Sequence, residues 1–81
     1  MMQWIIRDID IGHNLQELRK RIGYSQSEVE TKLSLSGSTL SRNAYGKIEL
    51  GHRNIKASDI VALKYIFDAT YEEIFEGISP K

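Results

Sequence analysis

The chain has 81 residues, of which 41% are hydrophobic and 27% are charged, and it contains no cysteine. This length and balance are typical of one folded domain, and the lack of cysteine excludes a disulfide framework, a thiolate zinc site and thiol catalysis. No apolar run approaches the roughly 20 residues of a membrane helix, and no secretory signal pattern opens the chain, so we expect a cytoplasmic protein without a membrane partner.

The formal charges cancel over the whole chain but are unevenly distributed along it. Residues 12–56 carry eight Lys and Arg side chains against four Glu, a net charge of +4. Residues 57–80 carry one Lys against five Asp and Glu, a net charge of −4. Such asymmetry is typical of a domain with one basic binding face and an acidic back.

The chain divides into an N-terminal extension, residues 1–10, and one compact domain, residues 11–78. The extension is predicted to be a short strand or coil, in which Ile5, Ile9 and Ile11 would share one side if the segment is extended. The domain opens with apolar residues at spacings of three and four, which predict an amphipathic helix over residues 11–22. The residues on its inner face are Ile11, Leu15, Leu18 and Ile22.

A second helix is predicted over residues 26–33. Ser25 and Glu28 form a capping-box pattern at its start, and Val29 and Leu33 share one face. The following segment, residues 34–40, is rich in Ser and Thr side chains that bond to nearby backbone and therefore favours a turn.

A third helix is predicted over residues 42–50, with Ser41 as its N-cap. At about 100° per residue, its two faces differ in chemistry. The inner face carries Ala44, Tyr45 and Ile48, and the outer face carries Arg42, Asn43, Gly46 and Lys47.

Two more helices complete an all-α, five-helix fold. The fourth covers residues 57–67, and the fifth opens at Thr70 and stops at Gly77. The inward residues of these two helices are Ile60, Leu63, Ile66, Phe67, Ile74 and Phe75. Most of the aromatic residues are expected in the core, namely Tyr24, Tyr45, Tyr65, Phe67, Tyr71 and Phe75.

Two segments carry a family resemblance. Residues 18–26 read LRKRIGYSQ and residues 45–55 read YGKIELGHRNI. Together they resemble the lambda-repressor/Cro-like helix-turn-helix family, over residues 11–76, and this resemblance implies that helices two and three form the helix-turn-helix. The chain departs from the family at Glu30 and Ser34, where Ala and Gly are usual, and in its longer connection between the two helices.

The resemblance implies sequence-specific binding of double-stranded DNA by a bacterial or phage transcription regulator, most simply a repressor. The family match assigns base reading to Arg42, Asn43 and Lys47 and a DNA contact to Gln26. Arg42 suits guanine and Asn43 suits adenine, because their side chains match the edges of those bases. With Gln26, we expect Arg53 and Lys56 to hold phosphates. The match also makes Arg19 and Glu49 an internal ion pair.

One such domain reads few base pairs, so we expect a homodimer on a pseudo-palindromic operator. The alternative is a protein-interaction module such as an antitoxin or anti-repressor, which suits the neutral charge and the apolar residues 4–6. In that case the polar face of helix three is only solvated, and Gln26 only decorates a helix end. His13 and His52 lack neighbours at ligand spacing, so we expect no metal, no cofactor and no enzymatic activity.

Overall fold

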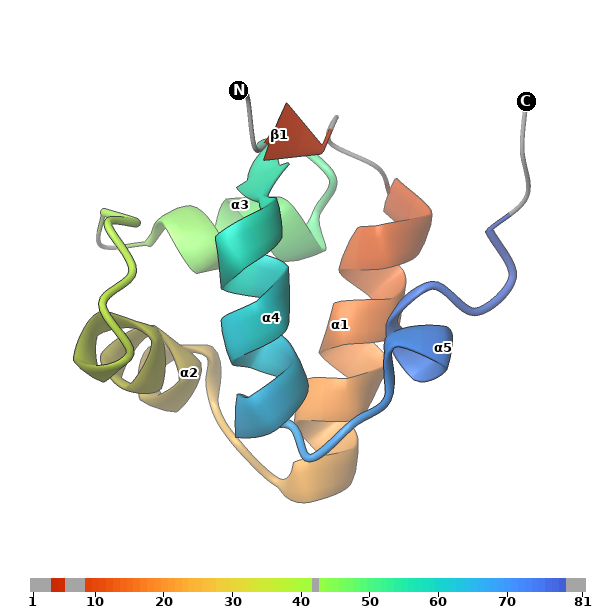
Figure 1. Cartoon of the computed structure of the whole chain (residues 1–81), viewed down its shortest axis with the longest axis horizontal. Coiled ribbons are helices and arrows are strands. Elements are labelled where there is room, and N and C mark those ends of the chain that lie inside the picture. Colours follow the sequence, from red (N-terminus) through yellow and green to blue (C-terminus); the bar gives the residue numbers. More distant parts are fainter. Residues whose placement is uncertain (1–3, 6–8, 42, 79–81) are drawn as a thin grey trace.

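The computed structural model describes residues 4–5, 9–41 and 43–78. This part of the chain contains five helices and one short two-stranded sheet (Figure 1). The elements in chain order are β1 (Trp4–Ile5), α1 (Ile9–Ile22), α2 (Gln26–Leu35), α3 (Ala44–Glu49), β2 (Ile55–Lys56), α4 (Ala57–Ile66) and α5 (Tyr71–Ile74). The all-α, five-helix prediction is confirmed.

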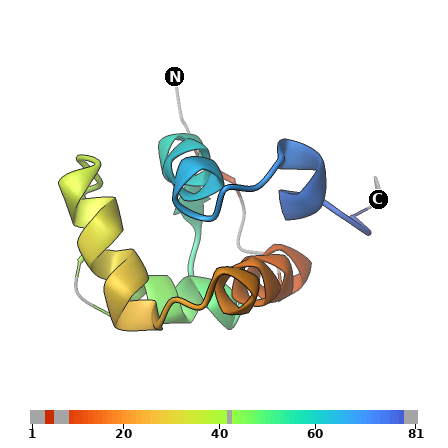
Figure 2. The same cartoon turned by 90° about the horizontal axis from the view of Figure 1, so that it is seen from below.

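The helices surround one hydrophobic core. α1 and α3 lie along one side of the molecule, α4 and α5 lie along the other, and α2 runs from the first side toward the second (Figure 2). The apolar faces predicted from the helical spacing meet between them. The largest fully buried side chains are Tyr45, Phe67, Leu15, Leu33, Ile55, Leu63, Ile74 and Val29.

Several apolar residues predicted to point inward are exposed instead. Ile22 is the last residue of α1, Tyr65 and Tyr71 lie on the outer faces of α4 and α5, and Phe75 directly follows α5. Tyr65 is 72% exposed. The core is already filled by residues of the inner faces, and a four-residue α5 cannot bury both Ile74 and Phe75. The prediction that these aromatic residues join the core is therefore wrong.

Local capping chemistry defines the ends of two helices. The Ser25 hydroxyl accepts the Glu28 N–H at 3.1 Å, and the Glu28 carboxylate accepts the Ser25 N–H at 3.0 Å. Thr70 and Glu73 make the same reciprocal pair at the start of α5. Each box satisfies two backbone amides that a helix N-terminus leaves free, so α2 and α5 begin at defined residues.

Among the described residues of the N-terminal extension, Trp4–Ile5 form the strand β1, which pairs antiparallel with β2, whereas residues 9–10 already belong to α1. Trp4 lies opposite Lys56 and Ile5 lies opposite Ile55, so the start of the chain is joined to the segment that enters α4. Ile6 lies outside the described residues. None of the described helices is long and apolar enough to cross a membrane.

The third helix begins later than predicted. Its N-cap is Asn43, not Ser41, and Asn43 adopts a left-handed backbone conformation with φ at 70°. Because a right-handed helix cannot continue backward through a left-handed residue, α3 starts at Ala44. The placement of Asn43 in the first helical turn is therefore wrong, and Arg42 lies outside the described residues. The connection from α2 to α3 covers residues 36–43.

Candidate nucleic-acid interface

α3 has one buried face and one exposed face. Ala44, Tyr45 and Ile48 are almost completely buried against the core, whereas Asn43 and Lys47 are exposed. The buried face prevents α3 from turning about its axis. Whatever meets its outer surface therefore meets the polar side chains of Asn43 and Lys47.

The C-terminal end of α3 is held by a buried ion pair. Arg19 Nε of α1 lies 2.7 Å from Glu49 Oε2, and the two side chains are 13% and 2% exposed. Burial alone would raise the pKa of the Glu49 carboxyl, but the hydrogen bonds that it accepts outweigh burial and lower the pKa. Glu49 is therefore charged, and it joins α1 to α3 through a charge-assisted bond.

Gln26, the first residue of α2, joins the same cluster. Its side-chain Nε2 donates to Glu49 Oε1 at 3.0 Å, while Arg19 donates a further bond to the carbonyl of Tyr24 at 2.9 Å. The Gln26 amide also lies against Gly46, where an added Cβ would be 3.1 Å from the Gln26 Oε1. One carboxylate thus joins α1, α2 and α3, and we call Arg19, Glu49 and Gln26 the carboxylate clamp.

Gly12 is a structural residue of this site that the sequence analysis did not identify. An ideal Cβ at Gly12 would lie 2.4 Å from the carbonyl oxygen of Glu49 and 2.6 Å from that of Ile48. No side chain fits at these distances, so α1 and the end of α3 approach each other through backbone. The available signal was a glycine inside a predicted helix, because glycine lowers helix stability and is usually kept there for a packing reason.

The N-terminal end of α3 is built differently. The N–H of Asn43 donates to Glu30 Oε2 of α2 at 3.4 Å, and the N–H of Ala44 donates to the Ser41 carbonyl at 3.1 Å. No side chain among the described residues caps the helix. The contact with Glu30 was not predicted; the only signal was a Glu where the family usually has Ala.

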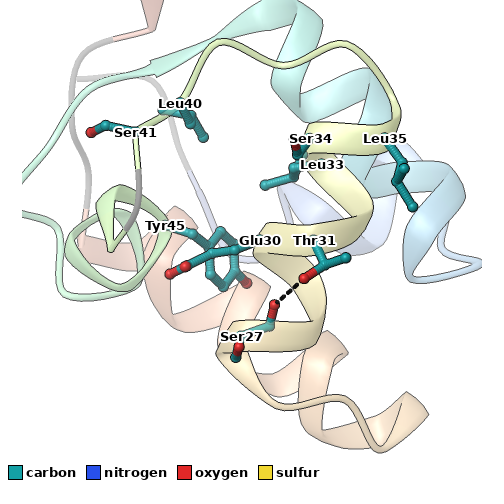
Figure 3. Close-up of a pocket in the computed structure, with 9 residues that line it drawn as sticks. All are labelled: Ser27, Glu30, Thr31, Leu33, Ser34, Leu35, Leu40, Ser41 and Tyr45. Carbon is teal, nitrogen blue, oxygen red and sulfur yellow. Dashed lines mark hydrogen bonds between the residues drawn. The ribbon is translucent and has the colours of Figure 1, made fainter.

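A cavity of about 420 Å³ lies between α2 and the segment that leads into α3 (Figure 3). Glu30 extends from α2 toward α3 on its wall, and the ring of Tyr45 lies at its base. The residues that line it are Ser27, Glu30, Thr31, Leu33, Ser34, Leu35, Leu40, Ser41 and Tyr45. Leu40 and Ser41 of the connection thus face α2 across this cavity, whereas the N–H groups of Ser36 and Ser38 bond back to carbonyls of α2.

The two remaining cations predicted to hold phosphates follow α3 in the chain. Arg53 is exposed in the loop between α3 and β2. Lys56 is half-buried, and its Nζ donates to the Thr39 hydroxyl at 3.2 Å. The structure thus gathers Gln26, Arg19 and Glu49 in one cluster and leaves Asn43, Lys47 and Arg53 exposed.

Comparison with known proteins agrees with this geometry. The sequence matches the helix-turn-helix family model over residues 15–64, which includes α2, α3 and the connection between them. The structure is similar to the crystal structure of the restriction-modification controller protein C.AhdI from Aeromonas hydrophila, with a TM-score of 0.65 and 36% sequence identity. That similarity covers 83% of this chain and 94% of the controller protein.

A search among curated proteins found no match. The family match nevertheless covers more than half of the chain, and the solved structure matches over most of it. Both agree with a helix-turn-helix whose second helix has a buried apolar face and an exposed polar face. The chain therefore belongs to the lambda-repressor/Cro-like helix-turn-helix family of DNA-binding transcription regulators.

Proposed function

We propose that this protein is a transcriptional repressor that binds a specific pseudo-palindromic operator as a homodimer. The observation that carries the proposal is the fixed orientation of α3. The clamp and the buried face hold the helix, so Asn43 and Lys47 are the polar side chains that it offers to a major groove. The similarity to a restriction-modification controller supports a promoter within a restriction-modification system as the one regulated.

Asn43, Lys47 and Arg42 are the proposed base-reading residues. The Asn43 side chain makes no capping bond to α3 and is exposed, so its amide is available for the paired donor and acceptor of an adenine edge. Lys47 lies one turn along the same helix and suits the acceptor atoms of guanine. Arg42 directly precedes Asn43 in the chain, and its guanidinium suits the same base.

Gln26, Arg53 and Lys56 are the proposed phosphate contacts. A primary amide carries two N–H bonds, so Gln26 can keep its bond to Glu49 and offer the second to a phosphate oxygen. The Lys56 ammonium donates to the Thr39 hydroxyl, and its positive charge attracts a phosphate. Contacts of this kind fix the register of a protein on DNA and carry no base information themselves.

Exposed apolar side chains away from α3 support the homodimer. Leu35 at the end of α2 is 84% exposed, and Val61, Tyr65 and Tyr71 are exposed on α4 and α5. A soluble monomer seldom leaves several large apolar side chains exposed close together without a partner. Sedimentation should therefore give a dimer, and Leu35→Ser with Tyr65→Ser should shift it toward monomer.

Salt dependence of binding tests the proposed function. An operator is first selected from random duplexes, and its affinity is then measured at several salt concentrations. Each neutralised phosphate should contribute about −0.9 to the slope of log K against log salt. Arg53→Ala should make the slope shallower by about one phosphate contact.

The second candidate function is binding of a protein partner, as in an antitoxin or anti-repressor. The same exposed apolar residues favour it, because they fit a partner as well as a second copy. The salt titration separates the two functions. A protein that selects no duplex, or whose binding ignores salt, is not the proposed repressor.

A further inference from the structure

The N-cap residue of α3 has an uncommon backbone conformation. Asn43 has φ at 70° and is one of two non-glycine residues with positive φ in the described part of the chain. A left-handed conformation is unfavourable for most L-residues, and Asn tolerates it better than most. The chain therefore keeps a side chain at this position where glycine would be easier to accommodate.

The contact made by Glu30 bears directly on this conformation. Its Oε2 accepts the N–H of Asn43 at 3.4 Å, and Glu30 is half-buried on α2, thirteen residues earlier. Leu40 and Ser41 of the connection face α2 across the cavity that Glu30 lines. Glu30 thus joins α2 directly to Asn43, the N-cap residue of α3.

We propose that Glu30 is a positioning residue for base reading by Asn43. By accepting the Asn43 N–H, it holds that residue in the left-handed conformation and ties the exposed amide to α2. This inference rests on the proposed function, because it assigns Asn43 a base. Glu30, on the face of α2 that lines the cavity, would thus affect base preference without touching DNA itself.

The negative charge of Glu30 does not itself help DNA binding, so a positioning role explains this residue better than an electrostatic one. A carboxylate near the DNA-binding helix repels phosphates and lowers affinity for every sequence. Glu30→Gln keeps an acceptor oxygen of similar reach and removes the charge, whereas Glu30→Ala removes both. The two substitutions should therefore act differently on affinity and on preference.

The test compares both variants on the selected operator and on duplexes with single-base changes. Asn43→Gly should lose about 5- to 150-fold of preference at one base pair in each half-site. Glu30→Ala should lose most of the preference at that same pair, and Glu30→Gln should retain it while binding all sequences more tightly. Glu17→Ala, an exposed glutamate on α1, is the matched control and should change nothing.

A double-mutant cycle and a DNA-free measurement complete the test. Glu30→Ala combined with Asn43→Gly should lose no more preference than Asn43→Gly alone. In the free protein, the backbone chemical shifts of Asn43 should leave the left-handed range in Glu30→Ala and stay in it in Glu30→Gln.

Three outcomes would overturn the proposal while leaving DNA binding intact. These are an unchanged preference profile in Glu30→Ala, equal weakening on every duplex, and an unchanged profile in Asn43→Gly. If the wild-type protein selects no duplex, the proposed function fails first. The chemical shifts of Asn43 then decide whether Glu30 holds the backbone; unchanged shifts in Glu30→Ala would refute that step too.

Discussion

The two ends of α3 are held in opposite ways. At the C-terminal end, Glu49 is buried and bonded to Arg19 and Gln26, and Gly12 lets the backbone of α1 approach closely. At the N-terminal end, Asn43 is exposed, and one 3.4 Å contact with Glu30 joins it to α2. The angle of α3 is thus fixed at the end farther from Asn43.

This difference separates the residues that orient α3 from the residue that we propose reads a base. A base-reading side chain must be displayed by a backbone held to within a fraction of an ångström, but it must not itself be buried. The carboxylate clamp supplies the rigid support. The N-terminal end of α3, which we call the open end, displays Asn43. Substitutions at the clamp should therefore act mainly on stability, and substitutions at the open end should act mainly on preference.

The largest expected effect is at Glu49. Glu49→Gln removes the charge that pairs with Arg19 and leaves that guanidinium mostly buried without its counter-ion. Removing one partner of a buried ion pair costs about 3 kcal/mol or more in the free energy of unfolding. For a domain of this size, the midpoint of thermal unfolding should fall by roughly 10–25 °C.

Calorimetry of Glu49→Gln beside Glu17→Gln measures this effect. Glu17 is exposed on α1, and its substitution should leave the midpoint unchanged. A fall of only a degree or two in Glu49→Gln would mean that the pair is solvated. The contrast between the two ends of α3 would then be lost.

Gly12→Ala should give the next largest effect. The added Cβ would meet two carbonyl oxygens of α3, and backbone yields less easily than a flexible side chain. Overpacking of this kind costs about 1–3 kcal/mol, and here it exceeds the gain of about 1 kcal/mol in helix propensity. Urea unfolding measures the net change in the free energy of unfolding. A more stable Gly12→Ala protein would show that α1 and α3 are not in close contact.

Acid should weaken the clamp in a pH range set by Glu49. Because its pKa is lowered in the folded protein, the unfolded state binds the proton more readily. The stability that Glu49 contributes is full above its unfolded pKa and is lost as pH falls through the folded pKa. The difference in stability between wild type and Glu49→Gln should therefore narrow in acid.

Urea unfolding of both proteins at a series of pH values tests this expectation. Glu28 and Glu73 also have lowered pKa values, the first through its bond to the Ser25 backbone and the second through Arg21, which lowers the Glu73 pKa to about 2. They give both proteins the same remaining acid sensitivity. A constant difference at all pH values would exclude Glu49 as the titrating group.

Features set by neighbouring residues could be predicted from the sequence. The Ser25 and Glu28 capping box involves residues three apart, and the apolar spacing of α1 places Leu15 and Leu18 correctly in the core. The pairing of Arg19 with Glu49 spans 30 residues and was expected only through the family resemblance. Local rules thus account for the helices, and the resemblance accounts for the clamp.

The start of α3 could not be predicted in the same way. Ser41 and Asn43 are both favourable N-cap residues, so local preference does not choose between them. The observed cap has a left-handed backbone and a contact with Glu30 of another helix, neither of which follows from the spacing of apolar residues. The exposure of Tyr65 has a similar origin, because it depends on how much core the other helices fill.

The smallest expected effect on stability lies at the open end, where its sign depends on the residue introduced. Asn43→Gly should raise the free energy of unfolding by up to about 0.5 kcal/mol, because glycine adopts the left-handed conformation without steric cost. Asn43→Ala should lower it by about 1 kcal/mol, because alanine lacks the local hydrogen bonding that helps Asn there. Urea unfolding of the two variants measures the difference in stability, and both variants lack the side-chain amide that we propose reads a base. They should therefore lose the same preference on duplexes while differing in stability. Equal stabilities would mean that the left-handed backbone is not retained in solution, and the open end would then need another description.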